Sequence, residues 1–221
     1  KTGKVVGSVR CVYEPDPDRM AVRYAFAAFL GKCDPDAAKT VKEVFVTRAD
    51  NGLDVVIHAG VEPGLDMRQD LAEFAENLDL ARLSWKVGDA NDEPVAARRT
   101  PTVAFEGIDV PVPPGGFLQA TRNGEASLTN AIKVALQRIP ARHVADLFCG
   151  IGSFTFALAL GGDRRNVVAV ESDPRAVRSL QYAVGQSSSP IKVVERDLFR
   201  RPLDKADLSG LDLVLFDPPR A

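Results

Sequence analysis

The segment 146–152, Asp-Leu-Phe-Cys-Gly-Ile-Gly, combines a carboxylate with two glycines at a spacing suited to holding a small ligand. Gly150 and Gly152 let the backbone turn tightly and approach a ligand closely, because neither carries a side chain. Asp146 favours a positively charged group nearby and disfavours a phosphate. The segment therefore predicts a binding loop for a cofactor that carries positive charge.

Three further carboxylates, Glu171, Asp197 and Asp217, follow predicted strands. A carboxylate at Glu171 can accept hydrogen bonds from both hydroxyls of a ribose, and one at Asp197 can accept from an adenine amino group. In an open parallel sheet, ligands bind beyond the carboxyl ends of the strands. These positions together indicate a nucleoside cofactor.

Two cofactors fit this arrangement, a nicotinamide dinucleotide and S-adenosylmethionine. A dinucleotide loop needs a third glycine three residues after the second, which brings the helix close under the pyrophosphate. Position 155 is Thr. Asp146 would repel a pyrophosphate but attract the ammonium of a methionine group. The details therefore favour S-adenosylmethionine.

Strands alternate with helices in the second half of the chain. Apolar runs predict strands at 144–148, 167–170, 191–194 and 211–216. Ser153 opens a helix predicted over 154–160. Asp173 and Pro174 provide the N-cap and first helical position of another, over 175–185. This alternation predicts parallel β/α units in a Rossmann-like, doubly wound α/β sheet.

The first part of the chain has a different pattern. Extended runs at 44–47 and 53–58 flank Asp-Asn-Gly at 50–52, a strong hairpin signal, and a helix is predicted over 66–78. Two more extended runs, 102–105 and 108–112, follow. We expect a small α+β domain over residues 1–115.

A segment rich in proline and glycine, 113–116, precedes a helix predicted over 124–138. We expect residues 116–221 to be the N-terminal half of a methyltransferase domain. Because a sheet ending on so apolar a strand as 211–216 would expose a hydrophobic edge, we expect this sheet to be incomplete and the chain to be part of a longer protein.

The composition is that of an ordinary soluble protein, with 45% hydrophobic and 26% charged residues. The net charge of −2 gives no overall basic character, so nucleic-acid binding would need a local basic patch. No apolar run approaches the roughly 20 residues that cross a bilayer. Three widely spaced cysteines suit a reducing compartment. We expect a cytoplasmic protein without membrane contact.

Three segments resemble the RNA uracil-5-methyltransferase family, most closely its bacterial enzymes of 23S ribosomal RNA. They are 146–155 (Asp-Leu-Phe-Cys-Gly-Ile-Gly-Ser-Phe-Thr), 117–119 (Phe-Leu-Gln) and 216–221 (Phe-Asp-Pro-Pro-Arg-Ala). The resemblance is good over residues 80–221 and loose before them. It implies a class I methyltransferase, a monomer when whole, that methylates C5 of a uridine in structured RNA, ribosomal rather than transfer RNA.

The resemblance also implies a set of residues that line the cofactor pocket. They are Gln119, Phe148, Glu171, Asp197 and Asp217, together with Gly150, Gly152 and Ser153 of the loop region. Ser153 stands where family members often carry asparagine. The family uses a cysteine thiolate to attack C6 of uridine and a base, expected to be glutamate, to remove the C5 proton. Both are expected downstream of Ala221, so this chain should bind the cofactor without catalysing the reaction.

The cysteines of this chain have other expected roles. Cys149 is interpreted as a small packing residue beside the methionine group. Cys33 resembles the last of four cysteines that hold an iron–sulfur cluster in part of the family, but the other three would precede Lys1, and Cys11 does not reproduce their spacing. A cluster therefore belongs at most to the full-length protein, and no metal site is predicted here.

Several other residues invite a functional interpretation. His58 and His143 lack a ligand cluster and are interpreted as structural, and Trp85 as a core residue. The pair Arg98-Arg99 is either solvated surface or a contact to RNA phosphate.

Three alternative functions remain open. The first is methylation of a base amino group in DNA or RNA, for which an aromatic residue in place of Arg220 would be typical. The second is a nicotinamide-dependent oxidoreductase, which Thr155 and Asp146 disfavour. The third is a non-catalytic module that binds RNA or senses the cofactor.

Overall fold

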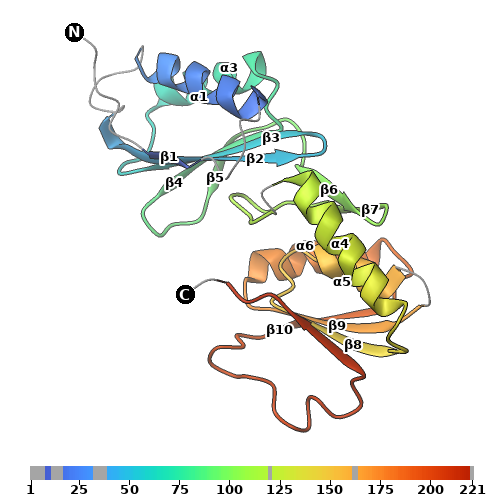
Figure 1. Cartoon of the computed structure of the whole chain (residues 1–221). Helices are drawn as coiled ribbons and strands as arrows, with labels where there is room; N and C mark the ends of the chain where they lie inside the picture. The colour runs from blue at the N-terminus through green and yellow to red at the C-terminus, as the bar shows by residue number, and fades with distance from the viewer. Residues whose placement is uncertain (1–7, 11–16, 32–38, 119–120, 161–163, 220–221) are drawn as a thin grey trace. The chain divides into compact units, whose positions relative to one another are not determined.

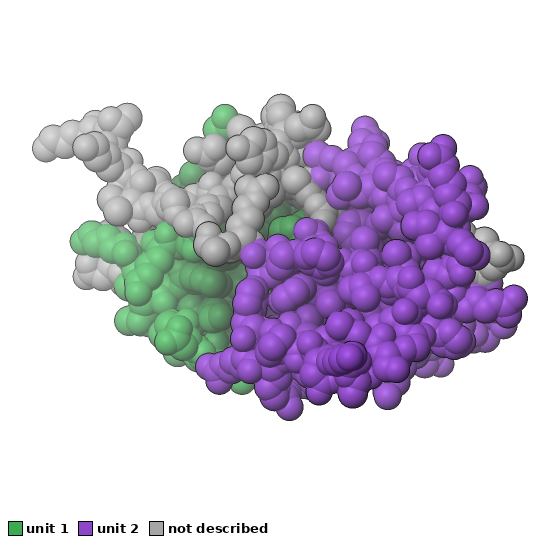
Figure 2. All heavy atoms as spheres, turned by 60° about the horizontal axis from the view of Figure 1, so that its bottom comes forward, with its two compact units in different colours: residues 1–101, 114–120 green, residues 102–113, 121–221 purple. Residues whose placement is uncertain are grey.

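The computed structural model describes residues 8–10, 17–31, 39–118, 121–160 and 164–219 (Figure 1). The chain divides into two compact units, each made of two separate stretches of sequence (Figure 2). Unit 1 comprises residues 1–101 and 114–120, and unit 2 comprises residues 102–113 and 121–221. The hairpin expected near the end of the first domain therefore belongs to unit 2, which also holds the four-stranded parallel sheet.

Unit 1 is built on a mixed sheet whose strands lie in sequence order. They are β1 (Ser8–Arg10), β2 (Val41–Ala49), β3 (Gly52–Ala59), β4 (Arg82–Val87) and β5 (Glu93–Ala97). β2 and β3 form the predicted hairpin, which closes from Ala49 to Gly52. β3 and β4 are parallel, because helix α3 (Leu65–Asn77) crosses over between them.

Two helices, α1 (Pro17–Leu30) and α3, cover one face of this sheet (Figure 1). Val55 and Ile57 alternate along β3 and are fully buried with Leu71 of α3, as the two-residue period of a strand requires. Trp85 of β4 belongs to the same core, and its Nε1 donates a hydrogen bond to the carbonyl of Val61 at 3.0 Å. Trp85 is thus a core residue, as predicted.

Unit 2 begins with the hairpin of β6 (Thr102–Phe105) and β7 (Ile108–Pro111). Its two turn residues, Glu106 and Gly107, have φ values of 51° and 80°, which suit a two-residue type I′ turn. Helix α4 (Arg122–Leu136) follows in unit 2, and the hydroxyl of its N-cap Thr121 accepts a hydrogen bond from the backbone of Gly124 at 2.9 Å.

The main sheet of unit 2 consists of parallel strands in the order β10 (Ile191–Glu195), β9 (Asn166–Glu171), β8 (His143–Leu147), β11 (Leu213–Phe216). Helices α5 (Ser153–Leu160) and α6 (Pro174–Gly185) make the crossovers from β8 to β9 and from β9 to β10. Figure 1 shows α4, α5 and α6 on one side of this sheet. The chain runs outward from β8 to β10 and then returns past β8 to β11, which confirms the predicted Rossmann-like arrangement.

The helices and strands of unit 2 share a core that includes Leu136 of α4, Leu158 of α5 and Val144 of β8. Asp212, just before β11, accepts hydrogen bonds at 2.8 Å from the backbone N–H groups of Arg142 and His143. These bonds hold the pKa of Asp212 below its ordinary value. They tie the start of β11 to the start of β8, which helps to fix how the opposite, carboxyl ends of the strands line up.

Candidate cofactor site

The carboxyl ends of the parallel strands meet at one edge of the sheet in unit 2. Leu147, the last residue of β8, lies opposite Val170 of β9 and Phe216 of β11. Glu171, at the end of β9, lies opposite Glu195 of β10. Because the strand order reverses at β8, this edge is where an open α/β sheet binds its ligands.

The loop after β8 has an unusual backbone. Phe148, Gly150 and Gly152 have φ values of 60°, 57° and 98°. A left-handed conformation costs a residue such as Phe148 about 1–3 kcal/mol, and strain of this kind is concentrated at functional sites. A Cβ on Gly152 would lie 2.6 Å from Cδ1 of Leu180, whereas a Cβ on Gly150 would meet no atom within 4 Å. The loop is therefore packed at Gly152 and open at Gly150.

Glu171 ties this loop to the end of β9. Its Oε2 accepts a hydrogen bond from the backbone N–H of Gly150 at 2.9 Å. Its Oε1 accepts from the backbone N–H groups of Ser172 and Asp173, at 2.6 and 2.9 Å. Glu171 is predicted to accept hydrogen bonds from ribose hydroxyls, and in the structure its carboxylate shapes the loop.

Asp146 is buried, and its carboxylate accepts a hydrogen bond from the hydroxyl of Thr155 at 2.6 Å. The pKa of Asp146 is raised to about 7, chiefly by burial and also by the negative charges of Asp217 and Glu171, while the Thr155 hydrogen bond lowers it. Thr155, whose side chain disfavours a dinucleotide loop, is thus the side-chain partner of the loop's acidic residue.

Asp197 organises the turn that follows β10. Its Oδ1 accepts hydrogen bonds from the backbone N–H groups of Phe199 and Arg200, at 2.9 and 3.1 Å. The ring of Phe199 lies 5.3 Å from the ring of Phe148, measured between centroids, and Phe199 is 71% exposed. The sequence gives no signal for this contact, because it depends on strand order rather than on spacing along the chain.

The remaining predicted site residues are less closely joined. Asp217 is exposed, and its backbone N–H donates to the carbonyl of Leu147 at 3.4 Å. Ser153 begins α5 and lines a hollow of about 320 Å³ between the β6–β7 hairpin and α4. Gln119 lies outside the described residues, as do Arg220 and the two cysteines at positions 11 and 33.

Cys149 lies in the loop but is poorly suited to nucleophilic chemistry. The side chain is buried, and burial raises the pKa of its thiol well above the ordinary value. The neighbouring charges of Asp146 and Glu171 raise it further. Since the thiolate is the reactive form, this environment agrees with the predicted packing role.

The electrostatics of the edge favour a cationic ligand. Glu171 and Asp217 lie close enough to Asp146 that their negative charges raise its pKa. Their combined negative charge attracts a sulfonium or an ammonium and repels a pyrophosphate. Together with the open space at Gly150, these carboxylates fit S-adenosylmethionine better than a dinucleotide.

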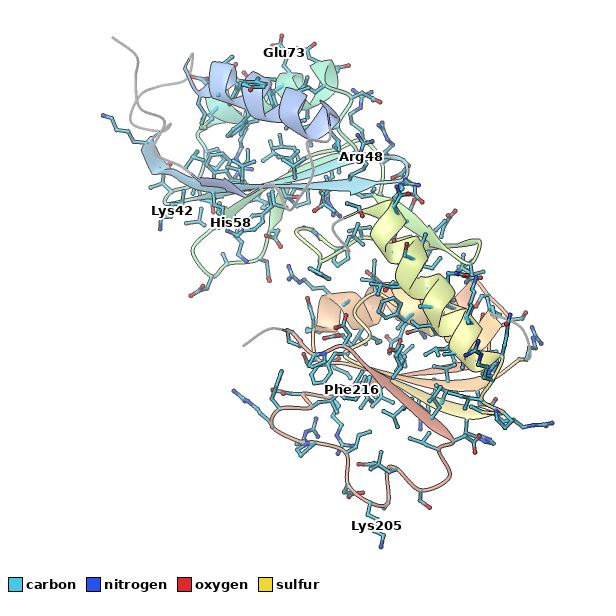
Figure 3. The ribbon with its side chains drawn as sticks, viewed as in Figure 1. Lys42, Arg48, His58, Glu73, Lys205 and Phe216 are labelled. Carbon is cyan, nitrogen blue, oxygen red and sulfur yellow. The ribbon has the colours of Figure 1, made fainter. Side chains whose placement is uncertain are left out.

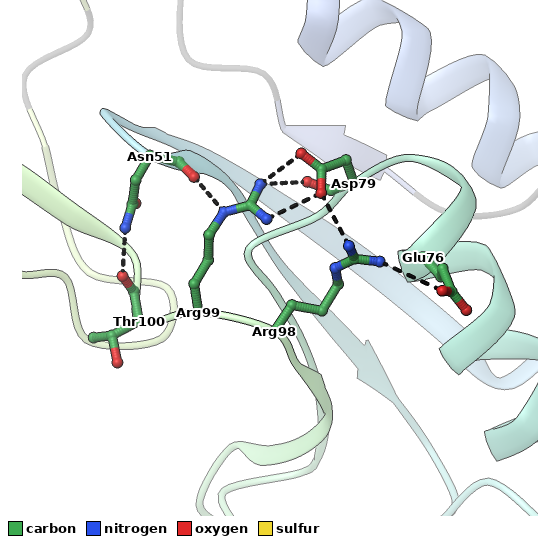
Figure 4. Close-up of polar contacts among 6 residues, drawn as sticks. All are labelled: Asn51, Glu76, Asp79, Arg98, Arg99 and Thr100. Carbon is green, nitrogen blue, oxygen red and sulfur yellow. Dashed lines mark hydrogen bonds and ion pairs between the residues drawn. The ribbon is translucent and has the colours of Figure 1, made fainter.

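The pair Arg98-Arg99 is engaged within unit 1 (Figure 4). The guanidinium of Arg99 binds both carboxylate oxygens of Asp79, at 2.8 and 3.0 Å, and also the carbonyl oxygen of Asn51. Arg98 lies 3.3 Å from Asp79 and 4.0 Å from Glu76. These contacts join the β2–β3 hairpin, the end of α3 and the segment after β5. They favour the structural interpretation of the pair over an RNA phosphate contact.

Both histidines have structural neighbours. The ring of His58 lies 4.7 Å from that of Phe45, and burial lowers the pKa of His58, with Lys86 lowering it further. Nδ1 of His143 lies 3.7 Å from a carboxylate oxygen of Asp212. Within the part of the chain that the structure describes, no three His, Cys, Asp or Glu side chains are grouped so as to hold a metal ion.

Residues 123–220 match the family described as the methyltransferase small domain. The chain is 38% identical over 177 residues to an uncharacterized RNA methyltransferase of Brucella suis, a match that covers 79% of this chain and 40% of the relative. It is 30% identical over 187 residues to the 23S rRNA (uracil(1939)-C(5))-methyltransferase of Shewanella piezotolerans, covering 83% of this chain and 41% of that protein. The chain thus spans about two fifths of the length of these relatives.

Among solved structures, the fold is similar to that of the Pyrococcus abyssi tRNA (uracil-54, C5)-methyltransferase in complex with S-adenosyl-L-homocysteine. The TM-score is 0.66 at 15% identity, and the match covers 98% of this chain and 55% of that one. The parallel sheet of unit 2 therefore resembles a class I methyltransferase fold, preceded by a mixed-sheet region. None of the described helices has the length and apolar character needed to span a bilayer.

Proposed function

We propose that this chain is the S-adenosylmethionine-binding part of an RNA methyltransferase that acts on C5 of a uridine. The proposal rests on one contact. The strained, open loop at Phe148–Gly152 is bound by the carboxylate of Glu171. The bond from Gly150 to Glu171 joins the two directly. This arrangement lies at the edge of the sheet where ligands bind in such folds.

Each of these residues has a proposed role in binding. Glu171 would accept a hydrogen bond from a ribose hydroxyl at Oε2, where the bond from Gly150 leaves one acceptor site, while Oε1 keeps its bonds from the backbone of Ser172 and Asp173. Asp197 would accept from the adenine amino group through Oδ2, which lies 3.4 Å from Nε of Arg200. Gly150, Phe148 and their neighbours would border the methionine part, with Asp146 buried nearby as a source of negative potential. When bound, the cofactor supplies an electrophilic methyl group.

The assignment to RNA and to uridine C5 rests on the relatives. Several are named RNA methyltransferases, and one is named for uracil C5 of 23S rRNA. We therefore propose ribosomal RNA as the substrate class. The reaction would need a thiolate nucleophile and a base, and the buried, protonated Cys149 does not provide the first. We assign both roles to parts of the whole protein other than the residues described here, as the resemblance implies.

The uridine assignment can be tested with the whole protein and RNA that carries tritium at C5 of its uridines. Methylation at C5 must release that tritium to water, whereas methylation of a base amino group releases none. We expect release from 23S rRNA and little from tRNA, with a Glu171→Ala variant inactive at the same cofactor concentration. Methyl transfer without tritium release would refute the C5 assignment and support the amino-methylating alternative.

A further inference from the structure

Asp146 is a buried carboxylate whose hydrogen-bond partner is a neutral hydroxyl. The residue is 2% exposed, and within the sheet it lies between Ala169 of β9 and Leu215 of β11. Its Oδ2 accepts a hydrogen bond from the hydroxyl of Thr155, on α5, at 2.6 Å. When ionised in such a place, a carboxylate has lost its hydration without gaining a counter-ion.

Two further carboxylates approach Asp146 from neighbouring strand ends. Glu171 ends β9, and Asp217 follows Phe216, the last residue of β11 (Figure 3). Their negative charges and, more strongly, burial disfavour ionisation of Asp146. The described groups that influence its charge are these two acids and Thr155, and none of them is cationic. Without a ligand, this arrangement favours a proton on Asp146.

The neighbouring thiol supplies no counter-charge. Cys149, in the loop after β8, is buried, and the charges of Asp146 and Glu171 add to burial in raising its pKa well above the ordinary value. The negative charge of Asp146 is then neutralised by a proton or by the positive charge of a ligand. S-adenosylmethionine carries a sulfonium and a net charge of +1, whereas S-adenosylhomocysteine has a neutral thioether and no net charge.

We propose that Asp146 exchanges its proton for the positive charge of S-adenosylmethionine and thereby distinguishes the methyl donor from its demethylated product. This inference rests on the proposed function and concerns the same site. When the donor binds, the O–H bond of Asp146 breaks and the proton passes to solvent. Once the methyl group has left, the sulfur is uncharged, and Asp146 recovers a proton from solvent. The product lacks the charge pairing that the donor has, so fresh donor replaces it more readily.

The expected size of the effect follows from the electrostatics of a buried acid. A nearby cation lowers the pKa of a carboxyl group by about 1–3. Because the pKa of Asp146 in the free chain is about 7, binding of S-adenosylmethionine at pH 7 should release about half a proton from this residue. Through the same residue, the affinity for S-adenosylmethionine should rise about five- to tenfold between pH 6 and pH 8.

Calorimetric titration of this chain in buffers of different ionisation enthalpy counts the protons released on binding. The difference between the parent and Asp146→Asn removes the protons that the ligand's own groups exchange. We expect this difference to be about half a proton at pH 7 for S-adenosylmethionine and close to zero for S-adenosylhomocysteine. Glu195→Gln is the matched control, because it removes an exposed carboxylate at the end of β10 and should leave the proton release unchanged.

The outcomes are separable. If the parent chain binds neither ligand, the proposed function fails, and this inference fails with it. If the parent binds S-adenosylmethionine and releases as many protons as Asp146→Asn does, the proton exchange is wrong while the cofactor site stands. A second comparison needs no variant: if the affinities of the parent for S-adenosylmethionine and S-adenosylhomocysteine changed in parallel between pH 6 and pH 7, the inference would also be overturned.

Discussion

Replacing Asp146 with asparagine should stabilise unit 2 at alkaline pH and remove a pH dependence of its stability. In the folded chain the pKa of Asp146 is raised from 3.8 to about 7, chiefly by burial. Between pH 3.8 and about pH 7, the folded chain therefore keeps a proton on Asp146 that the unfolded chain has released. Stability is favoured at low pH and falls as the pH rises through this window.

The size of the effect follows from the displacement of the pKa. Each pKa unit corresponds to about 1.4 kcal/mol, so the complete step amounts to about 4 kcal/mol. Between pH 5 and pH 8 the free energy of unfolding of the parent should fall by about 2–3 kcal/mol through this residue. Asparagine carries no charge and can still accept the hydrogen bond from Thr155. The variant should therefore match the parent near pH 4 and be more stable at pH 8.

The assay must distinguish the two units, because the chain need not unfold in one step. Hydrogen exchange of the β8 and β9 amides, measured at pH 5 and pH 8 and corrected for intrinsic exchange rates, reports on unit 2. Fluorescence of Trp85, the only tryptophan of the sequence, reports on unit 1 and should not respond to the substitution. Asp217→Asn is a suitable control, since it removes a neighbouring charge but leaves Asp146 buried. An Asp146→Asn variant with the same pH dependence as the parent would refute the reasoning.

Three further substitutions test the loop and the arginine pair of unit 1. Thr155→Val removes the hydrogen bond that lowers the Asp146 pKa, so the pH step measured by the same exchange experiment should move upward; an unmoved step would contradict this. At Gly152 the backbone has a positive φ, and an added Cβ would lie 2.6 Å from Leu180. Gly152→Ala should therefore lower the free energy of unfolding, measured by denaturant titration, by about 2–3 kcal/mol. Gly150→Ala should lower it by about 1 kcal/mol, because the space around that Cβ is open. Equal losses at both glycines would be contrary to the structure. Arg99→Ala should lower the thermal midpoint reported by Trp85 fluorescence and leave the RNA affinity of the whole protein unchanged. Weaker RNA binding at unchanged stability would instead indicate that the pair contacts RNA phosphate.

The sequence predicted the elements that local chemistry specifies. The Asp-Asn-Gly turn, the Asp173-Pro174 helix start and the apolar strands of unit 2 each carry their signal within a few residues, and all are present in the structure. The same holds for the β6–β7 hairpin, whose Glu-Gly turn has the backbone that its residues favour.

Features that depend on distant pairing were not predictable. Asp54 lies within an apolar run, and only the parallel register of β3 and β4 places Arg82 beside it, at 2.8 Å. The partnership of Thr155 with Asp146 and the contact of Phe199 with Phe148 have the same origin. The roles of the predicted cofactor residues, Gln119 among them, remain predictions until a ligand is bound.

Calorimetric titration of this chain with S-adenosylmethionine and, separately, with NADH tests directly which cofactor this edge of the sheet binds. We predict binding of S-adenosylmethionine in the micromolar range or weaker, its loss in Glu171→Ala with the fold retained, and no binding of NADH. Binding of NADH instead, or undiminished binding of S-adenosylmethionine by the variant, would contradict the assignment of this edge of the sheet as the methyl-donor site.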